Sequence, residues 1–102
     1  MTRDEMLTQL SRDLVKEGKL IEAGWIGLQL AAIPATAPQI QLDEMRMAFF
    51  AGAQHLFGSI TTILDPDADV TDADLQRMES IDAELRAFLA EFTTKHGLKT
   101  RQ

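Results

Sequence analysis

The sequence predicts an all-α protein of four helices, arranged as in a helical bundle. Apolar residues recur every three or four positions along most of the chain, which is the period of an amphipathic helix. No segment bounded by turn residues alternates apolar and polar side chains as a strand would. Helix-breaking residues at Gly18, Pro34, Pro38 and Pro66 divide the chain into four segments. The predicted helices span residues 3–17, 19–33, 42–64 and 72–95.

The first helix, residues 3–17, has a start signal and a stop signal. Thr2 and Glu5 match a capping box, in which a hydroxyl and a carboxylate satisfy unpaired N–H groups at the helix N-terminus. Gly18 is expected to end the helix, because glycine readily adopts the left-handed conformation of a C-terminal cap. We therefore expect residues 1–33 to form a helical hairpin.

The second helix, residues 19–33, is apolar on nearly every side. Glu22 and Gln29 supply its only clear polar stripe, so we expect several neighbours to cover it. One side also carries a row of small residues, which would allow a close crossing with the third helix: Ala23, Gly27 and Ala31.

The third helix, residues 42–64, is the expected centre of the fold. It contains no charged residue after Arg46, and most of its large apolar residues share one side of a helical projection. Pro34 and Pro38 are expected to keep the preceding segment extended as far as Gln41, because proline disfavours helix in the residue before it.

The fourth helix, residues 72–95, begins beside Thr71, whose hydroxyl can accept a hydrogen bond from a backbone N–H as an N-cap. Asp82 and Arg86 lie one turn apart with the acid first, the favourable order for an ion pair. Residues 97–102 begin with a glycine and are expected to end the helix and fray. Seven apolar residues form one stripe: Leu75, Met78, Ile81, Leu85, Phe88, Leu89 and Phe92.

Length and composition limit the classes of function. A chain of 102 residues is expected to form a single helical domain over residues 1–102. Its net charge of −6 and pI near 4.7 disfavour nucleic-acid binding, since an acidic protein repels phosphates. The chain has no cysteine, which excludes disulfides and thiolate chemistry. We see no secretory signal and no membrane span, and therefore expect a cytoplasmic protein without a membrane partner.

An acidic turn after the third helix resembles part of a calcium-binding loop. Asp65, Asp67 and Asp69 alternate as do the first ligands of an EF-hand. Val70 stands where that loop needs glycine, and Gln76 where it needs a bidentate glutamate. We interpret the segment as a helix stop followed by a solvated turn, and predict no metal site.

His55 is the one residue of the third helix that could begin a catalytic or metal site. No carboxylate and no second histidine lie within one helical turn of it, so we expect a structural or surface histidine. The chain also lacks a phosphate-binding glycine loop and a nucleophile motif. The sequence therefore predicts no catalytic residue, no cofactor and no enzymatic activity.

The second and third predicted helices present more apolar surface than the other two can cover. The simplest resolution is a homodimer in which these helices pack across a two-fold axis. Aromatic side chains carry most of the binding energy in such interfaces, and small residues allow close approach. The predicted interface residues are Trp25, Gly27, Phe49, Phe50 and Phe57.

Two other occupants of this apolar surface stay open. One is a different protein, of a kind that the sequence does not specify. The other is a small molecule held in an apolar pocket between residues 19–33 and 42–64. That pocket would be lined by Trp25, Phe50, His55 and Phe57.

Overall fold

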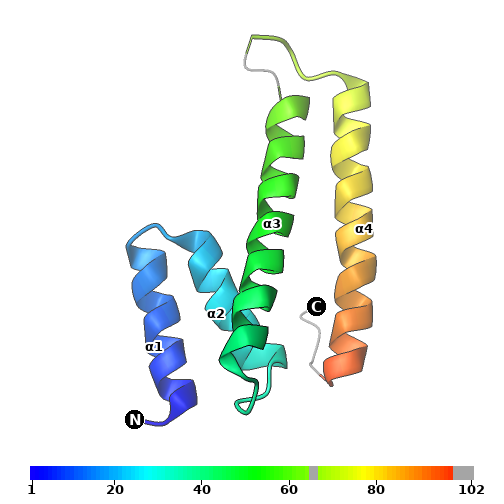
Figure 1. The fold of residues 1–102 in the computed structure, drawn as a ribbon. Helices are drawn as coiled ribbons and strands as arrows, with labels where there is room; N and C mark the ends of the chain where they lie inside the picture. Colours follow the sequence, from blue (N-terminus) through cyan, green and yellow to red (C-terminus); the bar gives the residue numbers. More distant parts are fainter. Residues whose placement is uncertain (65–66, 98–102) are drawn as a thin grey trace. The chain divides into compact units, whose positions relative to one another are not determined.

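The computed structural model describes residues 1–64 and 67–97, which form four α-helices (Figure 1). The helices are α1 (Arg3–Lys16), α2 (Leu20–Ala32), α3 (Gln39–Ile63) and α4 (Asp72–His96). No strand occurs in these described segments, which confirms the all-α class and the number of helices. The order of helices along the chain also matches the prediction.

The backbone divides into two compact units, Met1–Ala53 and Gln54–Gln102, which we call the N-terminal unit and the C-terminal unit. The N-terminal unit contains α1, α2 and the first part of α3. The C-terminal unit contains the last part of α3 and all of α4. Whether the chain behaves as a single domain stays a prediction, and each unit is described separately below.

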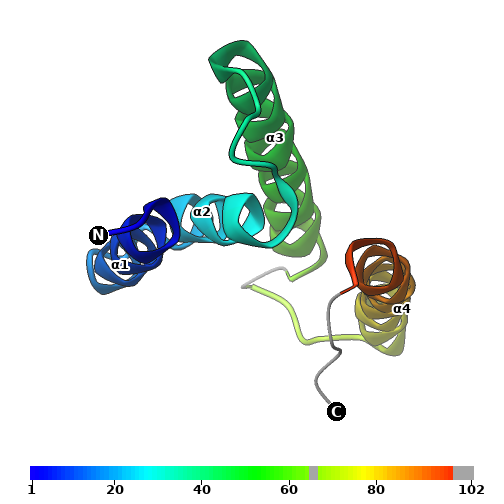
Figure 2. The same ribbon diagram turned by 90° about the horizontal axis from the view of Figure 1, so that it is seen from below.

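The hairpin of α1 and α2 forms as predicted. At the start of α1, one half of the predicted capping box forms: the Thr2 hydroxyl accepts a hydrogen bond from the Glu5 N–H at 3.1 Å, whereas the reciprocal bond to the Glu5 carboxylate is absent. At its end, Gly18 takes the left-handed conformation with φ of +80°. The Gly18 N–H donates to the Val15 carbonyl and the Lys19 N–H to the Leu14 carbonyl. These two bonds define a Schellman motif, so α2 can return alongside α1 (Figure 2).

The Gly18→Ala substitution is expected to lower the free energy of unfolding by about 1–2 kcal/mol, because a side chain disfavours the left-handed backbone. A Cβ atom at this position would meet no atom within 4 Å, so the cost is conformational and not steric. Gly52→Ala is the matched control: this glycine also faces open space, but it lies inside α3. There alanine should stabilise by about 0.5–1 kcal/mol. Urea midpoints that move in the same direction for both variants would contradict this account.

α3 begins earlier than predicted, at Gln39 instead of Leu42. The Pro38 carbonyl accepts hydrogen bonds from the N–H groups of Gln41 and Leu42, so the helix starts directly after the proline. The expectation of an extended segment to Gln41 was wrong because proline restricts the residue before it, whereas its own carbonyl can accept the first hydrogen bonds of a helix that follows. Ile33, which precedes Pro34, is extended as predicted.

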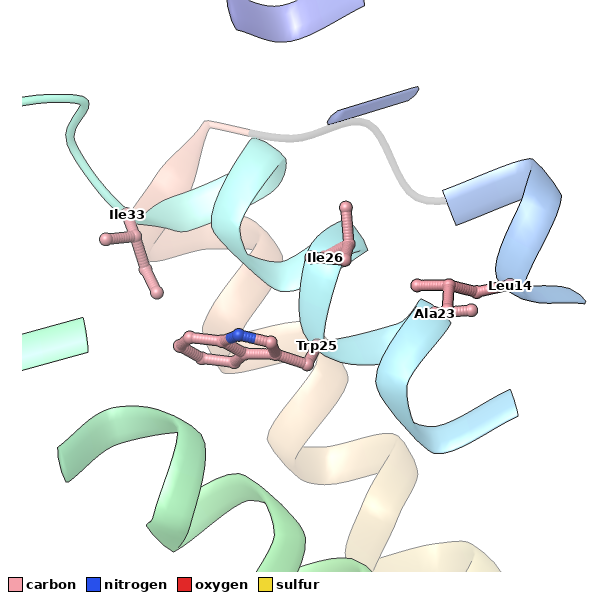
Figure 3. Packing of buried hydrophobic residues seen from close by; sticks show 5 residues of the cluster. All are labelled: Leu14, Ala23, Trp25, Ile26 and Ile33. Atoms are coloured by element: carbon pink, nitrogen blue, oxygen red, sulfur yellow. The ribbon is translucent and has the colours of Figure 1, made fainter. Parts of the chain in front are cut away.

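The core of the N-terminal unit lies around α2. Buried apolar residues come from α1, α2 and the residue after α2: Leu14, Ala23, Trp25, Ile26 and Ile33. In Figure 3, Leu14 lies beside Ala23, and Ile33 lies above the ring of Trp25. Partly buried residues of α3, among them Phe49 and Phe50, pack against this cluster. α2 therefore holds the N-terminal unit together.

α2 and α3 approach each other through Gly24 and Phe49. A Cβ atom at Gly24 would lie 3.3 Å from the tip of the Phe49 ring. The ring centroids of Phe49 and Trp25 are 6.0 Å apart, with the planes tilted. The small-residue row was expected to make this crossing, yet Gly27 in α2 and Gly52 in α3 both face open space. A large side chain of α3 thus lies against α2 at Gly24, whereas the close crossing was expected at the row of Ala23, Gly27 and Ala31.

A polar contact also joins α2 to α3 within the N-terminal unit. The Arg46 guanidinium donates to both carboxylate oxygens of Glu22, from Nε at 3.2 Å and from Nη2 at 2.6 Å. The same guanidinium lies 4.4 Å from the centroid of the Phe50 ring. The hydrogen bond to Glu22 is the main cause that raises the pKa of Arg46. This bidentate, ring-stacked geometry is one that arginine makes and lysine does not.

α4 starts and ends at its predicted caps. The Thr71 hydroxyl accepts from the Asp74 N–H, and an Asp74 carboxylate oxygen accepts from the Thr71 N–H, both at 3.1 Å. Gly97 takes the left-handed conformation with φ of +66° and closes the helix. The predicted ion pair of Asp82 and Arg86 forms at 2.8 Å. The predicted fraying after Gly97 concerns residues 98–102, which lie outside the described residues.

The cap of α4 is expected to make stability depend on pH. Hydrogen bonds from the backbone and side chain of Thr71, followed by the charge of Arg77, lower the pKa of Asp74 below its ordinary 3.8. A group whose pKa is lower in the folded state than in the unfolded state stabilises the fold at pH values above its unfolded pKa. This stabilisation is lost as the pH falls through the folded pKa. Asp74→Asn should therefore be less stable than the wild type at neutral pH, with a difference that disappears in acid. Urea titrations across pH check this, and a difference that stays constant would disprove it.

Candidate interaction surface

The structure places the predicted interface residues in different environments. Trp25 is buried, with 3% of its surface exposed, and Phe49 and Phe50 are half-buried beside it. Gly27 lies on the exposed side of α2, and Phe57 belongs to the C-terminal unit and is 66% exposed. Three of the five thus gather in the core of the N-terminal unit. Gly27 and Phe57 are the two that a partner could reach directly.

Every helix presents large apolar side chains to solvent. The sequence predicted a surplus on α2 and α3, and their exposed residues include Leu20, Ile21, Met47 and Phe57. α1 contributes three more, Met6, Leu10 and Val15. The exposed apolar residues of α4 are Leu75, Leu85, Phe88 and Leu89.

The apolar stripe of α4 is the surface that sequence reasoning missed. The surplus of apolar surface was predicted for residues 19–33 and 42–64, yet four of the seven apolar residues of α4 are also between 49% and 59% exposed. Thr93 is the single buried residue of α4, and its hydroxyl donates to the Leu89 carbonyl in its own helix. The sequence shows the stripe itself, but it does not show how much of the stripe other parts of the chain cover.

Aromatic rings extend this stripe to the C-terminal end of α4. The ring centroids of Phe88 and Phe92 are 5.7 Å apart, and those of Phe92 and His96 are 4.5 Å apart. These residues lie one turn apart on the helix, so their rings form a continuous row on one side. Rings of this kind supply much of the energy of helix interfaces when a partner covers them.

The surface of the N-terminal unit carries an open hollow beside the α1–α2 turn. Apolar side chains share its lining with two cationic residues and one acidic residue: Leu14, Gly18, Lys19, Leu20, Ile21, Glu22, Arg46 and Phe50. Of the four residues predicted to line an apolar pocket, Phe50 lines this hollow. His55 instead lines a more polar hollow of the C-terminal unit, together with Ser59, Asp74 and Arg77.

Among residues 1–64 and 67–97, no group of three or more histidine, aspartate or glutamate side chains is arranged to hold a metal ion. Asp65, the first residue of the EF-hand-like pattern, lies outside the described residues, and Asp69 and Val70 are exposed. No helix in the described part of the chain combines the length and apolar character needed to cross a membrane.

No protein-family model, curated protein or solved structure matches this sequence.

Proposed function

We propose that this chain is a non-enzymatic interaction protein that self-associates as a homodimer through its apolar helices. Its four helices would then complete a bundle-like arrangement with those of a second copy. The observation that carries the proposal comes from the C-terminal unit: none of its described apolar side chains is buried. That unit contains two phenylalanines in α4 and Phe57 in α3, which are expensive to leave in water.

The energetic argument concerns the number and spacing of these residues. Single exposed apolar residues are ordinary on protein surfaces, whereas contiguous apolar patches mark interaction sites. Burying one large apolar side chain contributes about 1.5–3 kcal/mol. The four exposed residues of α4 follow one helical stripe, so a single partner surface can cover all of them together.

Solution mass tests the proposal directly. Sedimentation equilibrium over a wide concentration range should give a species of twice the chain mass of 11.3 kDa. A mass of 11.3 kDa at every concentration would disprove self-association and would point instead to a different protein as the partner. Phe57→Ser changes a predicted interface residue that is 66% exposed, and we expect it to weaken the dimer. An unchanged dissociation constant would show that Phe57 is not part of the interface.

The hollow of the N-terminal unit supports a second candidate, a small-molecule-binding module. Leu20, Ile21 and Phe50 supply apolar surface. Arg46 already pairs with Glu22 of the same lining, so Lys19 supplies the excess positive charge that would attract an anionic group. An apolar anionic dye should then bind with a stoichiometry of one per chain, and Leu20→Ser should weaken binding. Weak binding with no defined stoichiometry, unchanged by Leu20→Ser, would exclude this function.

A further inference from the structure

We propose that the homodimer forms by antiparallel pairing of α4 with α4 of a second copy. This inference rests on the self-association proposed above and specifies the surface that carries it. Two properties of α4 lead to it: the exposed apolar stripe, and a pattern of charges on either side of that stripe.

The stripe has the seven-residue repeat of a coiled coil. With Leu75 as position a, the a positions are Leu75, Asp82 and Leu89, and the d positions are Met78, Leu85 and Phe92. Ile81 and Phe88 occupy g positions and widen the apolar face. The remaining b, c and f positions carry only small, polar or charged residues. A face of this kind packs against a second helix, with a and d side chains filling the gaps of the partner.

An antiparallel alignment brings the a and d positions of the two copies into matched layers. A two-fold axis between residues 83 and 84 places Leu75 opposite Phe92 of the other copy, and Met78 opposite its Leu89. The central layer pairs Asp82 with Leu85 of the other copy. Thus every layer holds one a residue and one d residue. A polar residue at one a position costs stability and fixes the register, which is the role we assign to Asp82.

The charges on either side of the stripe select this orientation. In the same alignment, the g positions of the two copies lie beside each other, which brings Asp74 close to Lys95 of the other copy. The e positions also lie beside each other, which brings Glu79 close to Arg86 of the other copy. The two-fold axis repeats each of these attractive pairs. A parallel, in-register alignment would instead place Asp74 near Glu79 of the other copy, which is repulsive. The macrodipoles of the helices also favour the antiparallel arrangement.

Disulfide cross-linking tests the orientation, and the chain is suited to it because it contains no cysteine. When Leu75→Cys and Phe92→Cys proteins are mixed and oxidised, the antiparallel register predicts a cross-linked heterodimer. Each variant alone should stay uncross-linked, because two residues at position 75 would lie about 25 Å apart at 1.5 Å per residue. Parallel pairing predicts the reverse, with a cross-link in each variant alone, and that result would overturn the proposal.

A charge exchange provides a second test at two exposed positions of α4, of which Arg86 also pairs with Asp82 in its own helix. Glu79→Arg should weaken the dimer roughly tenfold, since it turns two attractive pairs into repulsive ones. Within its own helix this substitution is favourable, because the new cation lies one turn from Asp82. Arg86→Glu should also weaken the dimer, and the double variant should restore it. Equal dissociation constants for the wild type and both single variants would overturn the proposal.

The two proposals fail in distinguishable ways. One outcome is a dimer that forms no cross-link between the Leu75→Cys and Phe92→Cys proteins and whose dissociation constant the charge variants do not change. This result would overturn the α4 pairing but not self-association. A chain that is monomeric at all concentrations would overturn both. If α4 binds a different protein instead, the isolated chain would also be monomeric. The charge variants would then change only the affinity for that other protein.

Discussion

Replacing Trp25 by alanine is expected to lower the free energy of unfolding by about 3–5 kcal/mol. The side chain is 3% exposed, and its ring packs against that of Phe49 at a centroid distance of 6.0 Å. Small domains have a total stability of about 5–15 kcal/mol, so this loss would remove a large part of it. Denaturant unfolding followed by far-ultraviolet circular dichroism measures the change.

Two matched variants define what the Trp25→Ala result means. Trp25→Phe keeps an aromatic ring in the same space and should cost less than the alanine variant. Ile40→Ala removes a side chain that is 70% exposed in the same unit, and its effect should stay within about 0.5 kcal/mol. A Trp25→Ala variant that unfolds at the wild-type midpoint would show that α2 does not organise the N-terminal unit.

Leu14→Ala is expected to cost about 2–5 kcal/mol and to release α1 from α2. Leu14 is the single buried residue of α1, at 9% exposed, and it lies beside Ala23 of α2 (Figure 3). Leu10 is the control, because it sits one turn earlier in the same helix and is 43% exposed. Leu10→Ala should cost clearly less than Leu14→Ala.

Amide hydrogen exchange adds a local measurement to the Leu14 comparison. Loss of the contact with α2 should speed exchange throughout α1 in Leu14→Ala, because an isolated helix of 14 residues is barely stable in water. Exchange in Leu10→Ala should stay close to that of the wild type. Similar exchange in the two variants would mean that α1 does not depend on Leu14 for its docking.

Local chemistry explains which parts of the fold the sequence predicts well. Gly18 and Thr71 end and begin helices because of backbone sterics and single hydrogen bonds, which depend on a few neighbouring residues. The start of α3 was missed because the restriction imposed by Pro38 falls on the residue before it, while its carbonyl accepts the first hydrogen bonds of the helix. Boundaries are therefore predictable where one local effect dominates.

Contacts between helices were harder to predict, because they depend on how each helix is rotated about its own axis. The sequence shows both Gly24 and Gly27 as small residues of α2, and rotation alone decides that Gly24 meets Phe49. The same reason limits prediction of the candidate interface. Trp25 and Phe57 look equivalent as apolar aromatics in the sequence, yet one is buried and the other is exposed.

The position of Trp25 gives this protein a spectroscopic property that separates its two units. It is the single tryptophan of a chain without tyrosine, and it lies within the N-terminal unit. Intrinsic fluorescence therefore reports on the N-terminal unit, whereas helical ellipticity reports on both. Coincident unfolding curves from the two signals would show that the units unfold cooperatively, as one domain does. An ellipticity change that precedes the fluorescence change would mean that α4 melts while the tryptophan is still enclosed.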